Sequence, residues 1–140
     1  MKTRSETAFE ALRLDDYRLS DEDESLLDEG AMDDLRDELG EYAFDEIVED
    51  GLFEVTERLA TLELSLIADD IDLAGALALD MIEPARAVGL PKLAELCEAL
   101  GRCCSGGDAI AARAVAERLL RVGEESLVAA AESVPAHAGA

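Results

Sequence analysis

The chain has 140 residues, which is the usual size of one domain and enough to bury a core. Hydrophobic residues make up 49% of the chain, there is no tryptophan, and the core must be built mainly from Leu, Ala, Val and Ile. The formal net charge of −22 argues against nucleic-acid phosphates and anionic membrane surfaces as partners. A solvated acidic surface and a basic protein partner remain as the two explanations of this charge.

The first forty residues predict only short elements. Residues 1–22 are polar and charged and predict a flexible acidic arm, with room for a short helix around residues 6–14. Apolar residues between 23 and 39 recur at helical spacing, and Gly40 is suited to end that short helix. Because no apolar signal segment or 18-residue apolar run is visible, we expect a cytoplasmic protein with no membrane partner.

Residues 41–68 predict the longest helix. Its apolar residues fall on one stripe of the helical wheel: Phe44, Val48, Val55, Leu59, Leu62 and Leu66. Glu54 and Arg58 are spaced for an ion pair along this helix. Asp70 or Asp72 is then expected to cap the next helix.

Three more helices are expected after residue 70. Gly89 is suited to end the first of them, Pro91 to begin the second, and Asp108 to cap the last, which covers residues 109–132. The residues of the last helix expected to face the core are Ile110, Ala114, Val115, Leu119, Val122 and Leu127. Short connections between four substantial helices predict an antiparallel up-down four-helix bundle over residues 23–132, with a short additional N-terminal helix and a disordered tail at 133–140.

Isolated glycines and cysteines are mostly expected to pack. Glycines 51, 75 and 123 lie within predicted helices, where they let neighbouring helices approach closely. Cys97 is expected to be buried, whereas Cys103 and Cys104 fit either a structural or a redox-sensitive role. No metal-ligand spacing, calcium loop or phosphate-cradling glycine loop is present, so we expect no metal, cofactor or small-molecule substrate.

Residues 72–100, DLAGALALDMIEPARAVGLPKLAELCEAL, resemble the central part of a histidine phosphotransfer (HPt) domain. In that family a site helix carries the pattern H-x-L-K-G-x-A, with a glycine ten residues after the histidine. If Gly89 takes the place of that glycine, Leu79 falls on the histidine, and Ile82 and Glu83 fall on the lysine and the first glycine. The positions that agree with the family are packing positions: Met81, Ala85, Gly89 and Leu90. The resemblance covers about residues 30–132.

The departures from the family pattern oppose phosphotransfer. The family uses an imidazole nitrogen to attack an aspartyl phosphate in the acidic, magnesium-containing pocket of a receiver domain, and Leu79 has no nucleophile. Ile82 lacks the positive charge of the lysine, and Glu83 adds bulk and a negative charge. The only histidine, His137, lies in the tail PAHAGA. The resemblance therefore implies a non-enzyme with no catalytic residue, which binds a response-regulator receiver domain or a histidine kinase.

The surface expected to bind is one face of the site helix. We call it the Leu79 face, and it consists of Gly75, Ala76, Leu79, Ile82, Glu83 and Arg86. An apolar spot rimmed by charges on a helix is suited to docking. Alternatively, the N-terminal arm or a kink at Pro84 covers this face, and its residues have drifted after activity was lost. A different function also fits the charge: an acidic adapter, unrelated to phosphorelay, that binds a basic partner through its 15–50 segment.

Overall fold

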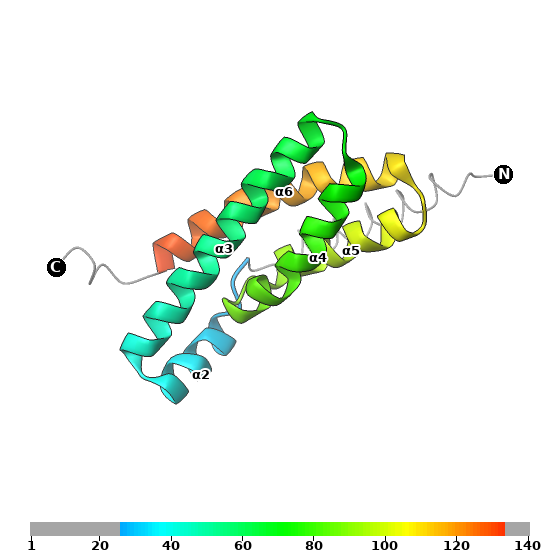
Figure 1. Ribbon diagram of the computed structural model, residues 1–140. Helices are drawn as coiled ribbons and strands as arrows, with labels where there is room; N and C mark the ends of the chain where they lie inside the picture. The colour runs from blue at the N-terminus through cyan, green and yellow to red at the C-terminus, as the bar shows by residue number, and fades with distance from the viewer. Residues whose placement is uncertain (1–25, 134–140) are drawn as a thin grey trace.

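The computed structural model describes residues 26–133, and these residues form helices without any strand (Figure 1). The five helices are α2 (Glu29–Leu39), α3 (Glu41–Ile67), α4 (Ile71–Ala87), α5 (Pro91–Ser105) and α6 (Ala109–Ser133). The predictions for the 1–22 arm with its 6–14 helix and for most of the 133–140 tail fall outside the described residues. An all-helical fold is confirmed for the part of the chain that is described.

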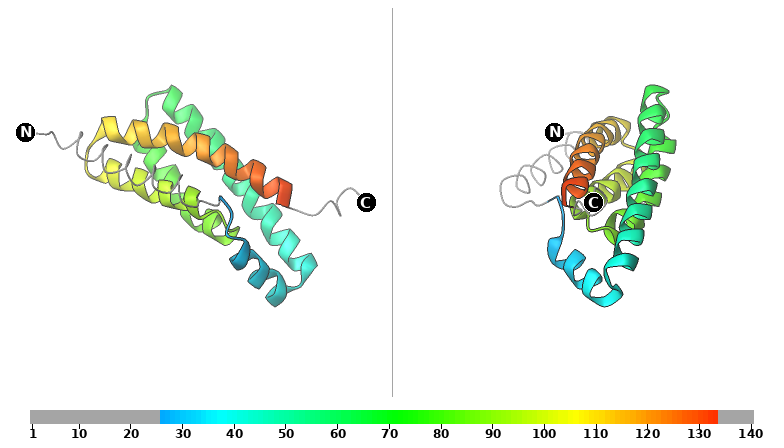
Figure 2. Two further views of the ribbon diagram at one scale, coloured as in Figure 1. Left: turned by 180° about the vertical axis from the view of Figure 1, so that it is seen from behind. Right: turned by 90° about the vertical axis from the view of Figure 1, so that its left-hand side faces the viewer.

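The helices pack side by side as a helical bundle (Figures 1 and 2). α4 packs between α3 and α5, and α6 packs along α5 and over a shorter stretch against α3. The short helix α2 packs on the beginning of α3, at one end of the molecule. The outward side of α3 therefore has no other described helix against it.

The helix ends follow from the capping residues that the sequence predicts. Asp28 and Asp70 accept hydrogen bonds from the backbone amides of Ala31 and Leu73 at 3.0 and 3.1 Å, as N-caps do. The Asp108 carboxylate plays the same part at the start of α6. Gly40 and Gly89, which follow α2 and α4, have φ values of 85° and 74°, a conformation that glycine adopts without steric cost. The predicted boundaries at Gly40, Asp70, Gly89 and Asp108 are confirmed, as is Pro91 in the first turn of α5, whereas the cap at Asp28 was not predicted.

The core lies between α3, α4, α5 and α6 and is almost entirely aliphatic. Its largest fully buried members are Leu62, Met81, Leu90, Leu93, Leu100 and Leu119. One predicted core residue is wrong, because the side chain of Ile110 is 73% exposed. The step of five residues from Ile110 to Val115 rotates about 140° around the helix, so the two cannot share the buried stripe. The stripe of α6 begins instead with Ala111, Ala112 and Val115.

Glycines allow three pairs of helices to approach closely, as predicted for positions 51, 75 and 123. A Cβ atom added to Gly123 would lie 2.7 Å from Leu59 of α3, and one added to Gly75 would lie 2.6 Å from the sulfur of Cys104 on α5. A Cβ atom on Gly51 would overlap Val88, the residue that follows α4. Each glycine therefore fills its place only because it has no side chain. α4 remains one helix through Pro84.

A second, smaller apolar cluster attaches α2 to the bundle. It consists of Met32, Phe44 and Val48, and the guanidinium of Arg36 lies over the Phe44 ring at 4.5 Å from its centroid. Leu27 touches both this cluster and the main core. The backbone amide of Asp28 donates to the carbonyl of Gly89 at 2.8 Å, which ties the start of α2 to the turn between α4 and α5.

Candidate docking face on helix α4

The four packing positions of the family pattern are all buried. The side chains of Met81 and Ala85 on α4, and that of Leu90 in the following turn, have no exposed surface. Gly89 is also buried and takes the left-handed conformation that ends α4. A Cβ atom on Gly89 would lie 2.8 Å from Met32 of α2, so this glycine is required by packing as well as by its φ.

The positions that carry chemistry in the family lie at the surface. The Leu79 side chain is 55% exposed, Glu83 is exposed, and Ile82 is half-buried against the core. Leu79 does not project freely into water, because its side chain lies against Gly101 of α5. A Cβ atom added to Gly101 would lie only 2.8 Å from Cδ2 of Leu79. The leucine therefore lies over the backbone of α5 and leaves roughly half of its surface in solvent.

Three further residues complete the predicted Leu79 face, and one of them does not belong to it. Ala76 is exposed, and the exposed Arg86 forms an ion pair with Glu98 across the boundary between α4 and α5. Gly75 is buried, because its side of the helix faces Cys104 of α5. The exposed part of the Leu79 face thus consists of Ala76, Leu79 and Glu83, with Ile82 and Arg86 at the edge toward α5.

The three thiols of the chain all lie on α5, and a raised pKa keeps each of them protonated. Burial raises the pKa of the Cys97 thiol to about 12. The pKa of Cys104 is raised by burial and by Asp72, and its Sγ–H donates to the carbonyl of Ile71 at 3.6 Å. Burial and Asp108 likewise raise the pKa of Cys103, against the opposing effect of Arg102. Because the thiolate is the reactive form, a structural role fits Cys103 and Cys104 better than a redox role.

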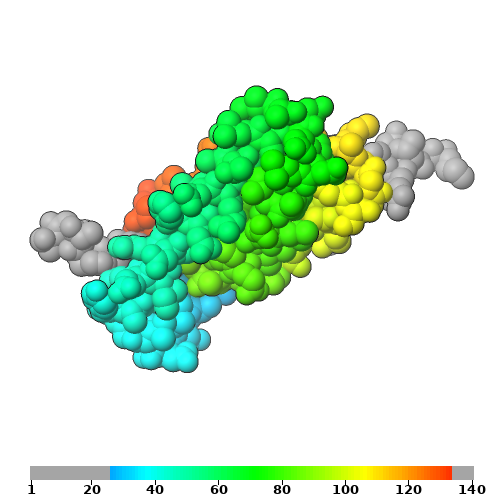
Figure 3. All heavy atoms as spheres, viewed as in Figure 1, coloured from blue at the N-terminus to red at the C-terminus, as the bar shows by residue number. Residues whose placement is uncertain are grey.

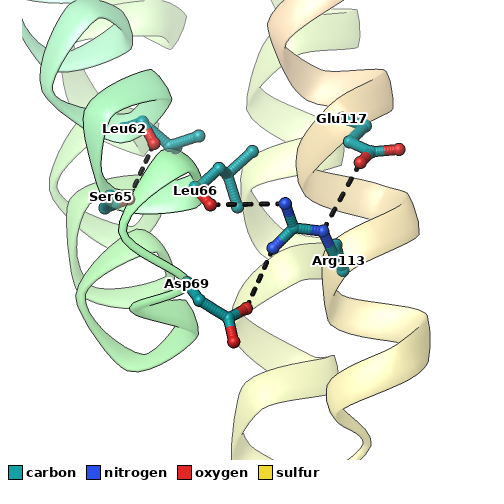
Figure 4. A network of polar contacts seen from close by, with 6 residues as sticks. All are labelled: Leu62, Ser65, Leu66, Asp69, Arg113 and Glu117. Atoms are coloured by element: carbon teal, nitrogen blue, oxygen red, sulfur yellow. Dashed lines mark hydrogen bonds and ion pairs between the residues drawn. The ribbon is translucent and has the colours of Figure 1, made fainter.

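A polar network at the C-terminal end of α3 has a structural role, and the sequence did not indicate it (Figure 4). Arg113 of α6 donates to the Leu66 carbonyl at 3.3 Å and to Asp69 at 3.1 Å, and its Nε lies 3.6 Å from Glu117. Asp69 has a φ of 59°, the left-handed conformation that follows the end of α3. The guanidinium therefore joins α6 to the C-terminal carbonyls of α3, where the helix dipole favours a positive charge.

Among residues 26–133, no group of three or more His, Cys, Asp or Glu side chains is arranged to hold a metal ion. Within the same range, no helix is both long enough and apolar enough to cross a bilayer. His137 lies outside the described residues. The exposed part of the Leu79 face thus offers apolar contact, the Glu83 carboxylate and, at its edge, the ion-paired Arg86.

Comparison with known proteins adds no relative: no family model, no curated protein and no solved structure matches this chain. The family resemblance therefore depends on the residues of the chain themselves.

Proposed function

We propose that this protein is an HPt-like domain that has lost phosphotransfer and acts as a noncatalytic binding protein in two-component signalling. In this proposal α3 to α6 form the antiparallel up-down four-helix bundle of the family, and Leu79 occupies the histidine position. The protein works in the cytoplasm, where its partner is a response-regulator receiver domain or a histidine kinase. Three free cysteines agree with such a reducing compartment.

One observation carries the proposal. The positions that match the family (Met81, Ala85, Gly89 and Leu90) are buried, while the position that departs most from it, Leu79, is half-exposed. A protein that has kept the fold of the family but lost its reaction is expected to match the family pattern at packing positions and to differ from it at surface positions.

The exposed part of the Leu79 face has the properties of a small docking surface. An apolar centre, formed by Leu79 and Ala76, lies beside Glu83 and the Arg86–Glu98 pair. Apolar centres with polar rims are the usual arrangement of protein interfaces, in which the centre gives affinity and the rim gives orientation. Leu79 is also held against Gly101, so it loses little side-chain freedom when a partner binds.

Calorimetric titration of the full chain with receiver domains from the same organism tests the proposal. Ala76→Arg is the most informative variant, because Ala76 is exposed and a long charged side chain there blocks contact without entering the core. Leu79→Arg tests the centre directly. We expect either variant to weaken binding at least about tenfold, which corresponds to about 1.4 kcal/mol.

The matched control is Ala131→Arg, which adds the same charge at an exposed alanine on α6. If no receiver domain or kinase binds, or if Ala131→Arg weakens binding as much as Ala76→Arg, the proposal fails. Incubation with a phosphorylated receiver gives a second readout. We expect no acid-labile phosphate on this chain, because Leu79 offers no nitrogen to accept it.

A further inference from the structure

Helix α3 carries an apolar row on its outward side, separate from the Leu79 face. We call it the outer stripe, and it consists of Tyr42, Phe53, Leu64 and Ile67, whose side chains are 80%, 63%, 64% and 76% exposed. The first three are eleven residues apart, which is close to three full turns, so they follow one line along the helix. The exposed Ala60 lies on the same line. Phe53, Ala60, Leu64 and Ile67 follow one another along the second half of α3, while Tyr42 lies about 16 Å from Phe53 with Glu46 and Glu49 between them. The apolar part of the outer stripe is therefore concentrated between Phe53 and Ile67.

No described helix covers this row. α3 packs on α2, α4 and α6 through its opposite side, where Phe44, Val55, Leu62 and Leu66 are buried. Figure 3 shows the surface of α3 open along the face of the molecule that it presents, with α4 beside it. The outer stripe is therefore a helix face that no described helix covers. Its apolar residues recur at intervals of about three turns along α3, and such a long, narrow face is suited to a helical partner.

The charges around the outer stripe define the chemistry of that partner. α3 contains eight Asp or Glu residues and a single basic residue, Arg58. Glu46 and Glu49 are exposed on the stripe itself, and Glu57 is exposed at its edge. Arg58 is turned toward Glu54, 3.6 Å away, and leaves these carboxylates without a counter-charge from their own helix.

We infer that the outer stripe of α3 binds a basic amphipathic helix of a partner protein. The apolar side of that helix covers Phe53 and Leu64, while its Lys and Arg side chains pair with Glu46, Glu49 and Glu57 and lie over the Tyr42 ring. A second copy of this chain is a poor occupant, because two surfaces of a protein with net charge −22 repel each other. The inference extends the alternative suggested by the sequence, but moves the surface from residues 15–50 to the whole length of α3.

A labelled synthetic peptide of about 22 residues, with Leu at helical i, i+3, i+4 and i+7 spacing and Lys elsewhere, serves as the probe. Fluorescence anisotropy measures its binding to the full chain at low salt. The test variant combines Phe53→Ser with Leu64→Ser, and its matched control combines Ile110→Ser with Val128→Ser, two exposed apolar residues of α6. All four substitutions are at exposed positions and leave the net charge unchanged, so thermal unfolding should show both proteins folded.

We expect the peptide to bind the wild-type chain and to lose at least about tenfold in affinity with the α3 variant. The α6 control should change affinity less than about twofold. Replacing Lys by Gln in the peptide should abolish binding, and about 0.5 M salt should weaken it strongly, because exposed charges are screened at that ionic strength.

Three results would overturn the inference. Equal losses in the α3 and α6 variants would mean unspecific attraction to an acidic protein. A wild-type dimer in sedimentation that becomes monomeric with Phe53→Ser and Leu64→Ser would assign the stripe to a second copy. A roughly tenfold gain in peptide affinity with Phe9→Ser and Leu12→Ser would assign it to the N-terminal segment of this chain. None of these results involves α4, so they are independent of receiver binding by the Leu79 face.

Discussion

At the scale of single residues, the positions without a side chain decide how the helices meet. Gly123 lies against Leu59, and Gly101 lies under Leu79. Glycine lowers the stability of a helix relative to alanine, so its presence at such positions is explained by the contact it allows. The same residue type can therefore be required at one site and replaceable at another.

Gly123→Ala and Gly30→Ala should have opposite effects on stability. A Cβ atom at Gly123 would lie 2.7 and 2.9 Å from two carbons of the buried Leu59, so we expect a loss of about 1–3 kcal/mol. Gly30, in the first turn of α2, has only one oxygen near its Cβ direction, at 3.8 Å, and alanine there should gain up to about 1 kcal/mol. Urea unfolding measures both. Equal effects of the two substitutions would contradict the packing role of Gly123.

The buried thiol of Cys97 should make stability fall at alkaline pH. Burial raises its pKa from 9.0 to about 12, so above pH 9 the unfolded chain releases a proton that the folded chain keeps. This contribution is fully present below pH 9 and is lost as the pH rises toward 12, by up to about 1.4 kcal/mol per pH unit.

The measurement compares the free energy of unfolding of wild type and Cys97→Ala at several pH values from 8 upward. The difference between the two proteins should change in favour of the variant above pH 9. A constant difference across this range would show that Cys97 titrates alike in the folded and unfolded chains.

At the scale of helices, the local sequence predicted where each helix begins and ends better than it predicted which helices contact one another. Asp70, Gly89 and Asp108 mark helix boundaries that the sequence can predict, because a capping residue interacts with backbone groups only three or four positions away. The contact of Arg113 with Leu66 joins residues 47 positions apart, which no local pattern reports. Phe53 and Leu64 were not singled out either, because periodicity identifies the main buried stripe and leaves the remaining apolar residues unexplained.

The same limit applies to the Leu79 face. A helical wheel placed Gly75 beside Leu79, but it could not say which flank of the helix packs against α5. Leu79, Ala76 and Glu83 were placed at the surface because they lie opposite the buried stripe, which the apolar spacing defines. The direction of the next helix decides the flanks, and that is a property of the tertiary fold.

Arg113→Ala should weaken the junction of α3 and α6. The substitution removes a donor to the last carbonyls of α3 together with two ion pairs, whose side chains are between 42% and 83% exposed and therefore screened by water. We expect a loss of about 1 kcal/mol, mainly from the backbone hydrogen bond. Arg121→Ala, at an exposed position of the same helix, is the matched control and should cost less. Equal losses in chemical denaturation would argue against a specific role of Arg113.

At the scale of the whole molecule, the negative charge is unevenly distributed. Residues 26–67 contain fourteen acidic and two basic residues, whereas residues 68–133 contain twelve and six. The net charges of −12 and −6 mean that repulsion is concentrated on α2 and α3. A basic partner would approach that half first and would relieve repulsion as it binds.

Salt should therefore stabilise the protein. Raising sodium chloride from about 0.02 to 0.5 M screens repulsion between exposed carboxylates, and we expect the melting temperature to rise by several degrees. Glu46→Gln with Glu49→Gln should reduce this rise more than Glu124→Gln with Glu125→Gln, which removes the same charge from α6. A salt response reduced equally by both pairs would mean that the repulsion is spread evenly.

The attachment of α2 has a consequence for how the molecule opens. α2 is held by the small cluster of Met32, Phe44 and Val48, by the Arg36–Phe44 contact and by the backbone bond from Asp28 to Gly89, and only Leu27, just before α2, also reaches the main core. Such a segment can detach while the rest stays folded, so its amide protons exchange with solvent at a lower free energy than those of α4 or α5. Each detachment uncovers Phe44 and Val48 on the most acidic helix. The protein would then expose, for short times, a larger apolar surface than its folded structure presents.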